Sequence, residues 1–199
     1  MAQGDLFAEE RSGGDERPLA IQLSPVLAGS NWNGVGNSRL TARDRGVGGV
    51  MIKRLSSEYG EGRGQAWWNW RIDPYTFDAV LIGVKPDQNG RKRQYTDYSF
   101  GVWEGDRLVT ITRTVSGLGK AEAAELDRFV KDHITGRHGP LRSVEPRLVF
   151  KLAFDSVAES SRHRSGLVLR GARIVQWERE ASAADAAKLE DVRALLGNS

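Results

Sequence analysis

Short apolar runs separated by turn residues dominate the chain from Phe77 onward, which is the pattern of a protein built mainly from β-strands. Strands are predicted at residues 77–84, 98–103, 107–115, 148–154 and 166–177. The second and third of these flank Glu104-Gly105-Asp106, a sequence typical of a hairpin turn. The spacing therefore predicts a small sheet whose successive strands are mostly close in sequence.

Helical spacing occurs in two places within this β pattern. Apolar residues between Leu118 and Ile134 fall near a period of 3.6, and Gly136 and Gly139-Pro140 are expected to end that helix. A closing helix is predicted from the stripe Leu189, Val192 and Leu196, with Ser182 and Asp185 as a capping box. Mainly β structure with a helix inserted midway fits a five-stranded OB-fold barrel, and an SH3-like barrel fits almost as well.

The first third of the chain is less regular. Residues 1–18 have the composition of a disordered tail, and residues 28–38 are rich in Gly, Asn and Ser, which predicts a loop. Residues 46–53 read as a buried strand ending at Lys53, and residues 67–71 (WWNWR) read as a half-buried strand. The glycines of segment 60–64 do not lie between a strand and a helix, so a connector is predicted rather than a phosphate loop.

Charge favours a polyanionic partner only mildly. The formal net charge is +3 and the pI is about 9.3, but two basic clusters stand out, Arg91-Lys92-Arg93 and Arg162-His163-Arg164. Clusters of this kind beside strands are candidates for contacts with nucleic-acid phosphates. The three histidines do not cluster with acidic residues, so no zinc site is predicted.

Compartment and membrane association are constrained by what the sequence lacks. The chain has no cysteine, which excludes disulfides and a thiol nucleophile. No stretch has the apolar length needed to cross a bilayer, and the acidic start lacks the apolar core of a secretory signal. A cytoplasmic protein with no membrane partner is therefore expected.

Five segments, in order, resemble the carboxy-terminal part of bacterial ATP-dependent DNA ligases. They are GVGGVMIKR (46–54), SSEYGEGRGQAWWNWRIDPYTFDAVLIGV (56–84), YTDYSFGVWEGDRLV (95–109), PRLVFKLAF (146–154) and SSRHRSGLVLRGARIVQW (160–177). The resemblance implies that residues 1–18 are a tail, 19–77 a remnant of the adenylation domain with a partial nucleotidyltransferase sheet, and 78–199 an OB-fold domain. It also implies ATP and Mg²⁺ as cofactors and nicked or duplex DNA as partner.

Site residues follow from the resemblance position by position. Lys53 matches the family pattern, whereas Asn69 and Arg71 stand where the family has lysines that reach the α-phosphate. Arg170 and Arg173 resemble arginines that orient the leaving pyrophosphate. Being three apart, they would face opposite sides of a continuous strand unless Gly171 bends it.

Departures from the family pattern bear on the chemistry. Gly48 replaces a glutamate of the metal and nucleotide environment, and Lys151 replaces a glutamate in the LVFE-like strand. Gln176 and Glu178 stand among expected arginines. No Lys-x-Asp-Gly, the motif whose lysine becomes adenylated, occurs in the 199 residues. A nucleophile must be held within bonding reach of the phosphate, so no other lysine is predicted to replace it, and no catalytic residue is assigned.

Three hypotheses remain open from the sequence. The first is a truncated ligase that binds DNA at Arg91, Lys92, Arg93, Arg162 and Arg164 but does not self-adenylate. The second is half of a split ligase, completed by a second chain that carries Lys-x-Asp-Gly. The third is a non-enzymatic OB-fold module that binds single-stranded DNA by stacking bases on exposed tryptophans.

Overall fold

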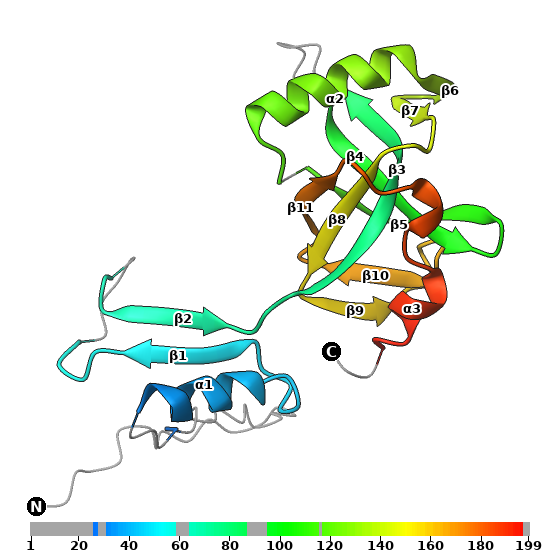
Figure 1. Ribbon diagram of the computed structural model, residues 1–199. Helices are drawn as coiled ribbons and strands as arrows, with labels where there is room; N and C mark the ends of the chain where they lie inside the picture. Colours follow the sequence, from blue (N-terminus) through cyan, green and yellow to red (C-terminus); the bar gives the residue numbers. More distant parts are fainter. Residues whose placement is uncertain (1–25, 28–30, 59–63, 87–94, 116, 197–199) are drawn as a thin grey trace, which may run out of the picture.

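A computed structural model describes residues 26–27, 31–58, 64–86, 95–115 and 117–196. The basic cluster at 91–93 and the predicted tail at 1–18 lie outside these residues. Figure 1 shows a curled β-sheet joined by a short linker to a smaller unit, made of a helix and a two-stranded ribbon. No helix among the described residues has the length and apolar character to span a bilayer.

The larger part is a strongly curled antiparallel sheet around one core. Five strands pair in the order β11-β8-β3-β4-β5: β3 (Tyr75–Pro86), β4 (Tyr95–Glu104), β5 (Arg107–Thr114), β8 (Val149–Phe154) and β11 (Arg173–Glu178). Helix α2 (Lys120–Asp132) lies between β5 and β8 in the chain. A helix between the third and fourth of five curled strands is the connectivity of the OB-fold, so this expectation is confirmed.

Aromatic rings fill the inside of the curled sheet. Phe100 and Phe150 are fully buried, with their ring centroids 5.5 Å apart, and Trp177 stacks on Phe150 at 5.2 Å. Tyr75 stacks on the buried Phe154 at 5.4 Å, near the start of β3. Burial of such large apolar rings is the main contribution to the stability of the sheet.

The sheet closes where β5 approaches the start of β11. The Thr114 hydroxyl donates to the carbonyl of Ala172 at 3.0 Å. Gly117 has a φ of 111°, and a β-carbon there would lie 2.0 Å from the carbonyl oxygen of Ile174. Only glycine fits this close approach of two backbones.

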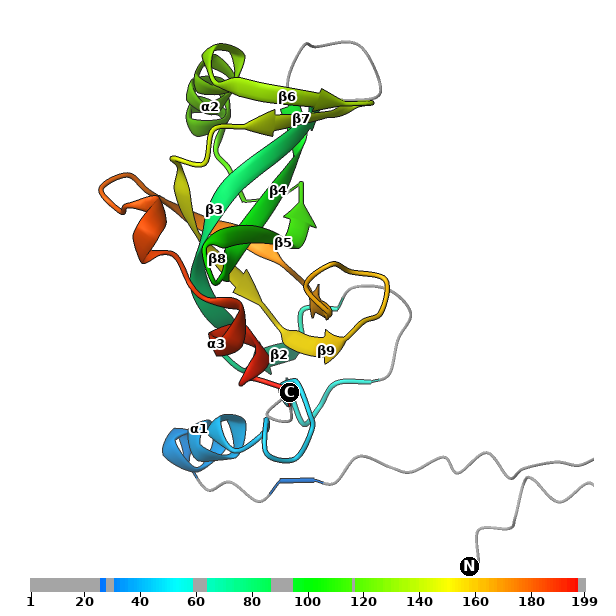
Figure 2. The same ribbon diagram turned by 90° about the vertical axis from the view of Figure 1, so that its right-hand side faces the viewer.

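Helix α2 agrees with its prediction and is fixed by contacts in its first turn and in its middle. The Glu122 carboxylate accepts from the backbone N–H of Gly119 at 2.9 Å and satisfies one orphan donor of the first turn. The buried Asp127 accepts from the N–H of Tyr95 at 3.1 Å, which joins the helix to the start of β4. In Figure 2 the helix lies at the end of the barrel farthest from α1.

Several elements differ from their prediction. Segment 28–38 was expected to be a loop, but α1 spans Trp32–Leu40, because Asn31 caps it by accepting from the N–H of Gly34. The single strand expected at 166–177 is split by Gly171 into β10 (Leu167–Arg170) and β11. Three strands were not predicted: β6 (Ile134–His138), β7 (Leu141–Val144) and β9 (Ser156–Glu159).

The expected closing helix is replaced by two short pieces. A 3₁₀ turn, η1, spans Ala183–Asp185, and α3 spans Leu189–Arg193. The predicted capping box does not form, since the Ser182 hydroxyl accepts from the N–H of Ala184. This segment crosses the barrel instead of extending as a helix, because the indole N–H of Trp103 donates to the carbonyl of Ala183 at 2.7 Å.

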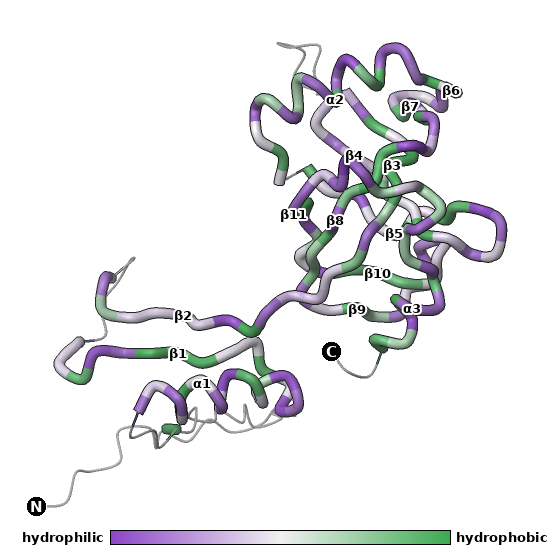
Figure 3. The backbone as a smooth tube through the Cα atoms, in the orientation of Figure 1, coloured by the Kyte–Doolittle hydropathy of each residue, from purple (hydrophilic) through white to green (hydrophobic). Residues whose placement is uncertain are grey.

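The smaller unit consists of α1 and an antiparallel ribbon of β1 (Gly49–Lys53) and β2 (Trp67–Arg71). The strand expected at 46–53 is present as β1 and ends at Lys53, but its expected burial was wrong, because only Val50 is buried. Apolar stretches, green in Figure 3, concentrate in the barrel strands, while β2 and α1 are mixed in character. Helix α1 therefore covers one face of the ribbon and leaves the other face accessible.

The buried phenol of Tyr98 makes the stability of the barrel depend on pH, which can be tested. Burial, and then the nearby Asp127 carboxylate, raise the pKa of this phenol from 10.0 to about 12. The fold favours the neutral phenol, so this stabilisation is complete below pH 10 and is lost as pH rises to about 12. Tyr98→Phe should cost about 1 kcal/mol at pH 8 through the lost hydrogen bond to the Tyr95 carbonyl.

Between pH 10 and pH 12, the free energy of unfolding of the wild type should fall by roughly 2–3 kcal/mol more than that of the variant. Urea unfolding at several pH values measures both effects. Parallel pH profiles for the two proteins would contradict the burial of this phenol as the cause.

Candidate nucleotide and DNA site

The pairing of β1 with β2 gathers three predicted site residues on one face of the ribbon. The register sets Gly49 opposite Arg71, Met51 opposite Asn69, and Lys53 opposite Trp67. Directly paired residues of antiparallel strands share a face, and every second residue along a strand returns to it. Lys53, Asn69 and Arg71 therefore lie on the same face, away from α1.

The opposite face packs against α1. Trp70 contacts Trp32 edge to face, with centroids 6.4 Å apart, and the guanidinium of Arg39 lies 5.3 Å from the Trp70 ring. This arrangement explains the alternation in WWNWR, because Trp68 and Trp70 share the face that turns toward the helix. The predicted alternation holds from Trp68 to Arg71, but the expected half-burial of this strand was wrong. Trp68 and Trp70 are exposed, and only Trp67, on the same face as Asn69 and Arg71, is partly buried.

Lys53 ends β1 with its ammonium 4.1 Å from the centroid of the Trp67 ring. A cation in this position is attracted by the negative face of the indole. The indole N–H of Trp67 donates to the Ser57 hydroxyl at 2.9 Å, which orients the ring. Lys53 is thus placed at the strand tip rather than extended freely into solvent.

A cleft of about 420 Å³ lies between the ribbon and the barrel. Its lining includes Asn69 and Arg71 from the ribbon, Asp73 from the linker and Asp155 from the barrel, together with the backbone of Gly48 and Gly49. The cleft therefore combines one permanent positive charge, one neutral amide and two carboxylates. Its basic wall suits phosphate oxygens, whereas the carboxylates suit cationic or hydrogen-bond-donating groups.

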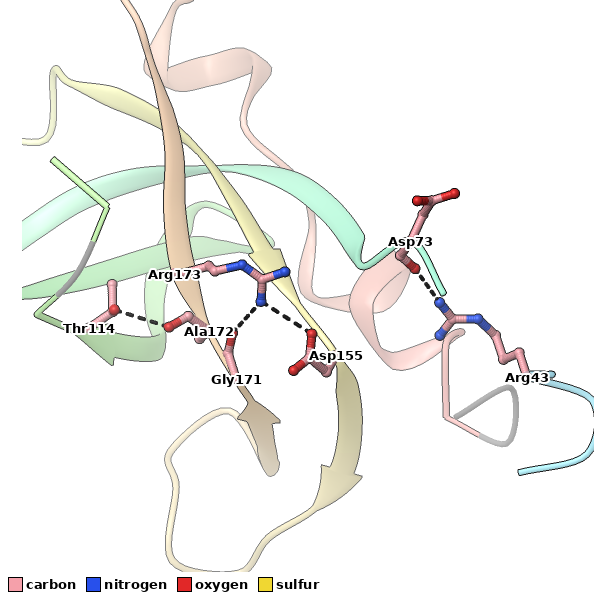
Figure 4. A network of polar contacts seen from close by, with 7 residues as sticks. All are labelled: Arg43, Asp73, Thr114, Asp155, Gly171, Ala172 and Arg173. Atoms are coloured by element: carbon pink, nitrogen blue, oxygen red, sulfur yellow. Dashed lines mark hydrogen bonds and ion pairs between the residues drawn. The ribbon is translucent and has the colours of Figure 1, made fainter. Parts of the chain in front are cut away.

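Arg173 does not line the cleft itself but is bound to Asp155, which does. Its guanidinium donates to Asp155 at 3.2 Å and to the carbonyl of Gly171 at 2.9 Å (Figure 4). Gly171 has a φ of 67°, so the bend that the sequence required between Arg170 and Arg173 is present. Arg170 ends β10 with an exposed side chain, and its carbonyl accepts from the N–H of Asp155 at 2.8 Å.

Of the two basic clusters, one can be located. Arg162 and Arg164 are exposed in the turn between β9 and β10, while Arg91, Lys92 and Arg93 lie outside the described residues. The turn is ordered by its own hydrogen bonds, among them one between the Ser160 hydroxyl and Nδ1 of His163 at 2.7 Å. Arg193 of α3 also donates to the carbonyl of Ser165, at 3.4 Å.

The turn that carries Arg162 and Arg164 lies between the fourth and fifth barrel strands, a connection that OB-folds commonly use for nucleic acids. It follows β8, whose end pairs with the start of β3.

The ability to hold a metal ion is limited in the described residues. They contain no group of three or more His, Asp or Glu side chains that could hold one. Gly48, in the position of the expected glutamate, lines the cleft without a side chain. The side chains present therefore fit nucleotide phosphates better than they fit Mg²⁺ by themselves.

Lys151 has a partner that the sequence did not reveal. Its ammonium lies 2.6 Å from the Glu178 carboxylate across the β8–β11 pair. The hydrogen bond to Glu178, followed by the charge of that group, raises the pKa of Lys151. Lys151 and Glu178 therefore pair with each other instead of projecting toward a ligand.

Four residues of the site region were missed at the level of sequence: Arg39, Arg43, Asp73 and Asp155. The only signal in the sequence is Asp73-Pro74, a dipeptide that marks the end of a strand and not a site. Arg43 donates to the carbonyl of Asp73, as Figure 4 shows, and Arg39 pairs with the Asp73 carboxylate. Contacts of this kind join segments about thirty residues apart, so local patterns do not reveal them.

The barrel with an adjoining β-ribbon is the architecture of ligase domains of known structure. The ligase domain of LigD from M. tuberculosis superposes with a TM-score of 0.50, at 19% identity, over 81% of this chain and 53% of that one. The ligase Pmar-Lig gives a TM-score of 0.57 at 15% identity, over 74% of this chain and 31% of that one. These likenesses support the fold.

Sequence relatives identify the particular family of ligases. A probable DNA ligase of Koribacter versatilis is 38% identical over 136 residues, 68% of this chain and 24% of the relative. A probable DNA ligase of Opitutus terrae is 31% identical over 98% of this chain and 21% of the relative. A DNA ligase of Halorubrum lacusprofundi is 29% identical over 99% of this chain and 34% of its own length.

No family model matches the chain. The chain is nevertheless homologous, over nearly its whole length, to the carboxy-terminal portion of DNA ligases of the ATP-dependent type. It spans only between about a fifth and a third of these three relatives.

The Gly171 bend offers a test of the barrel side of the cleft. A β-carbon at Gly171 would lie 2.4 Å from a carboxylate oxygen of Asp155. Gly171→Ala should therefore cost about 2 kcal/mol, through the positive φ and through displacement of Asp155 from Arg173. In an Asp155→Ala background the same change should cost only about 1 kcal/mol, because the carboxylate is gone.

Chemical unfolding of the four proteins of this cycle measures the coupling. If the losses in the free energy of unfolding were strictly additive, Asp155 would be free to move aside and would not hold Arg173 in place.

Proposed function

We propose that this chain supplies the OB-fold domain and the adjoining β-ribbon of a cytoplasmic ATP-dependent DNA ligase. In this proposal it binds nicked or duplex DNA, and its 199 residues alone do not form the lysine–AMP intermediate. The observation that carries the proposal is the gathering of Lys53, Asn69 and Arg71 on the open face of the ribbon, beside the barrel. Homology to DNA ligases over nearly the whole chain supports it.

The residues present have a limited chemical role in this proposal. Bound ATP, with its metal ion, would supply the adenylyl group. Lys53 and Arg71 would offset negative charge on the phosphates, and Asn69 would donate a neutral hydrogen bond. Arg173 would reach a ligand only after leaving Asp155. Positioning and electrostatic stabilisation of this kind are the main contributions of proteins to phosphoryl transfer.

Self-adenylation is tested directly with labelled ATP and Mg²⁺ followed by a denaturing gel. We expect no covalent label on the purified chain, because no Lys-x-Asp-Gly occurs in it. A ligase that does carry the motif serves as the positive control. Label on this chain would overturn the assignment and identify another lysine as the nucleophile.

DNA binding is tested by the salt dependence of affinity for a nicked duplex. Each phosphate contact adds about 0.9 to the slope of log K against log salt. Replacing Arg162 and Arg164 by alanine should therefore reduce the slope by about 2 and weaken binding at low salt. The matched control removes the same charge at Arg107 and Arg147, which pair with Glu104 and Glu145 on other loops.

An unchanged slope in the Arg162/Arg164 variant would exclude this turn as a DNA contact. Tighter binding of single-stranded DNA than of the nicked duplex, with quenched tryptophan fluorescence, would instead favour the stacking module. The accessible tryptophans for such stacking, Trp32, Trp68 and Trp70, belong to the α1–ribbon unit rather than to the barrel.

The second candidate is a split ligase, in which a separate chain contributes Lys-x-Asp-Gly. One observation favours it. Nine of the eleven exposed large hydrophobic side chains in the described residues lie between Val26 and Trp70. Such concentrations of exposed apolar surface mark protein interfaces. The ATP experiment is therefore repeated with lysate of the source cell. Label on a co-purifying chain, together with nick sealing that needs both chains, would support a split ligase. A chain that stays monomeric at high concentration would contradict it.

A further inference from the structure

Two arginines, in α1 and in the turn after it, bind the short linker (residues 72–74) between the ribbon and the barrel. Arg39 donates through Nε to the carbonyl of Arg71 and pairs through Nη2 with the Asp73 carboxylate. Arg43 donates to the carbonyl of Asp73 at 2.6 Å. All three acceptors lie in the three residues that lead out of β2.

Arg39 is held more firmly than an ordinary surface arginine. Its side chain is only 13% exposed, although its partner Asp73 is 81% exposed. The guanidinium is also near the ring of Trp70, with a carbon-to-centroid distance of 5.3 Å. Arg39 therefore has two hydrogen-bond acceptors and an aromatic face in one fixed geometry, which suits a planar guanidinium and not an ammonium.

Arg43 contacts the barrel as well as the linker. Its guanidinium carbon lies 3.8 Å from the centroid of Tyr75, the first residue of β3. Tyr75 in turn stacks on the buried Phe154, whose neighbour Asp155 lines the cleft. A continuous set of contacts thus leads from α1 through Arg43 and Tyr75 to the barrel core.

Strand pairing does not fix the ribbon relative to the barrel. Within the described residues, β1 and β2 pair only with each other, and the barrel strands form separate sheets. The backbone angles of Ile72, Asp73 and Pro74 can therefore set the orientation of the two units, as a few linker residues do in hinged proteins. Groups that immobilise Asp73 restrict this hinge.

We propose that Arg39 and Arg43 are positioning residues that clamp the linker at Asp73 and hold the cleft between Arg71 and Asp155 at one width. Opening of the cleft requires release of Asp73, and Arg43 contributes more than Arg39 because it alone contacts the barrel. The proposal concerns the unbound chain and does not depend on ATP or DNA binding. It assigns to the helix a function in domain orientation.

The test uses the absence of cysteine to attach two spin labels. Leu55→Cys in the β1–β2 connection and Asp106→Cys in the β4–β5 turn are both exposed positions, one in each unit. Pulsed electron resonance then gives the distribution of distances between the labels. The parent should give one narrow distribution, and Arg43→Ala should broaden it by about twofold, because the freed linker samples more backbone angles.

Arg39→Ala should broaden the distribution less, and Arg43→Lys should restore most of the parent distribution, since an ammonium still reaches a carbonyl and an aromatic face. Arg45→Ala is the matched control. Arg45 is an exposed arginine of the same turn, and its side chain has no hydrogen bond or ion pair among the described residues. This variant should leave the distribution unchanged.

The variant Asp73→Asn tests whether local unfolding of α1 could cause the broadening. It removes the carboxylate but leaves both arginines and the backbone carbonyl of residue 73 in place. It should broaden the distribution as Arg39→Ala does. Parent-like distributions in Arg43→Ala and Asp73→Asn, with unchanged far-ultraviolet circular dichroism, would overturn the proposal. Equal broadening by Arg45→Ala would also overturn it, since loss of any nearby charge would then suffice.

Discussion

Pairing of β3 on both of its sides is the interaction on which the rest of the structure depends. The first half of this strand pairs with β8 and the second half with β4, so one strand carries both halves of the barrel. Its beginning is the direct continuation of the linker, so the ribbon is joined to a strand whose middle, from Ala79 to Leu81, is fully buried. Pairing with this strand sets the barrel side of the cleft, and the ribbon side is connected to it only through the linker.

The sequence predicted those parts of the fold that local spacing determines. Alternation and turn residues identified the hairpin around Gly105, and helical spacing identified α2. Local rules failed where a neighbour decides the conformation. The glycine-rich α1 is stabilised by its Asn31 cap and by contact with Trp70, and the end of the chain crosses the barrel because Trp103 binds it.

The candidate site was predictable only as a set of positions. Matching of residue types marked Lys53, Asn69 and Arg71, but their common face follows from the strand register, which is a pairing property. The residues that hold the site together were invisible for the same reason. Asp155 and Arg173 become neighbours only when β8 and β11 pair, and Lys151 and Glu178 neutralise each other across the same pair.

The order of strands in the barrel has a consequence for how the chain folds. Strands β3, β4 and β5 are consecutive hairpins with short connections, so their contacts form early at small cost in loop entropy. Strand β8 must instead find the first half of β3 from far along the chain, and β11 must then close against it. During synthesis the aromatic side of the early meander stays uncovered until residues beyond Trp177 emerge, so this interval is when the nascent chain is most exposed to aggregation.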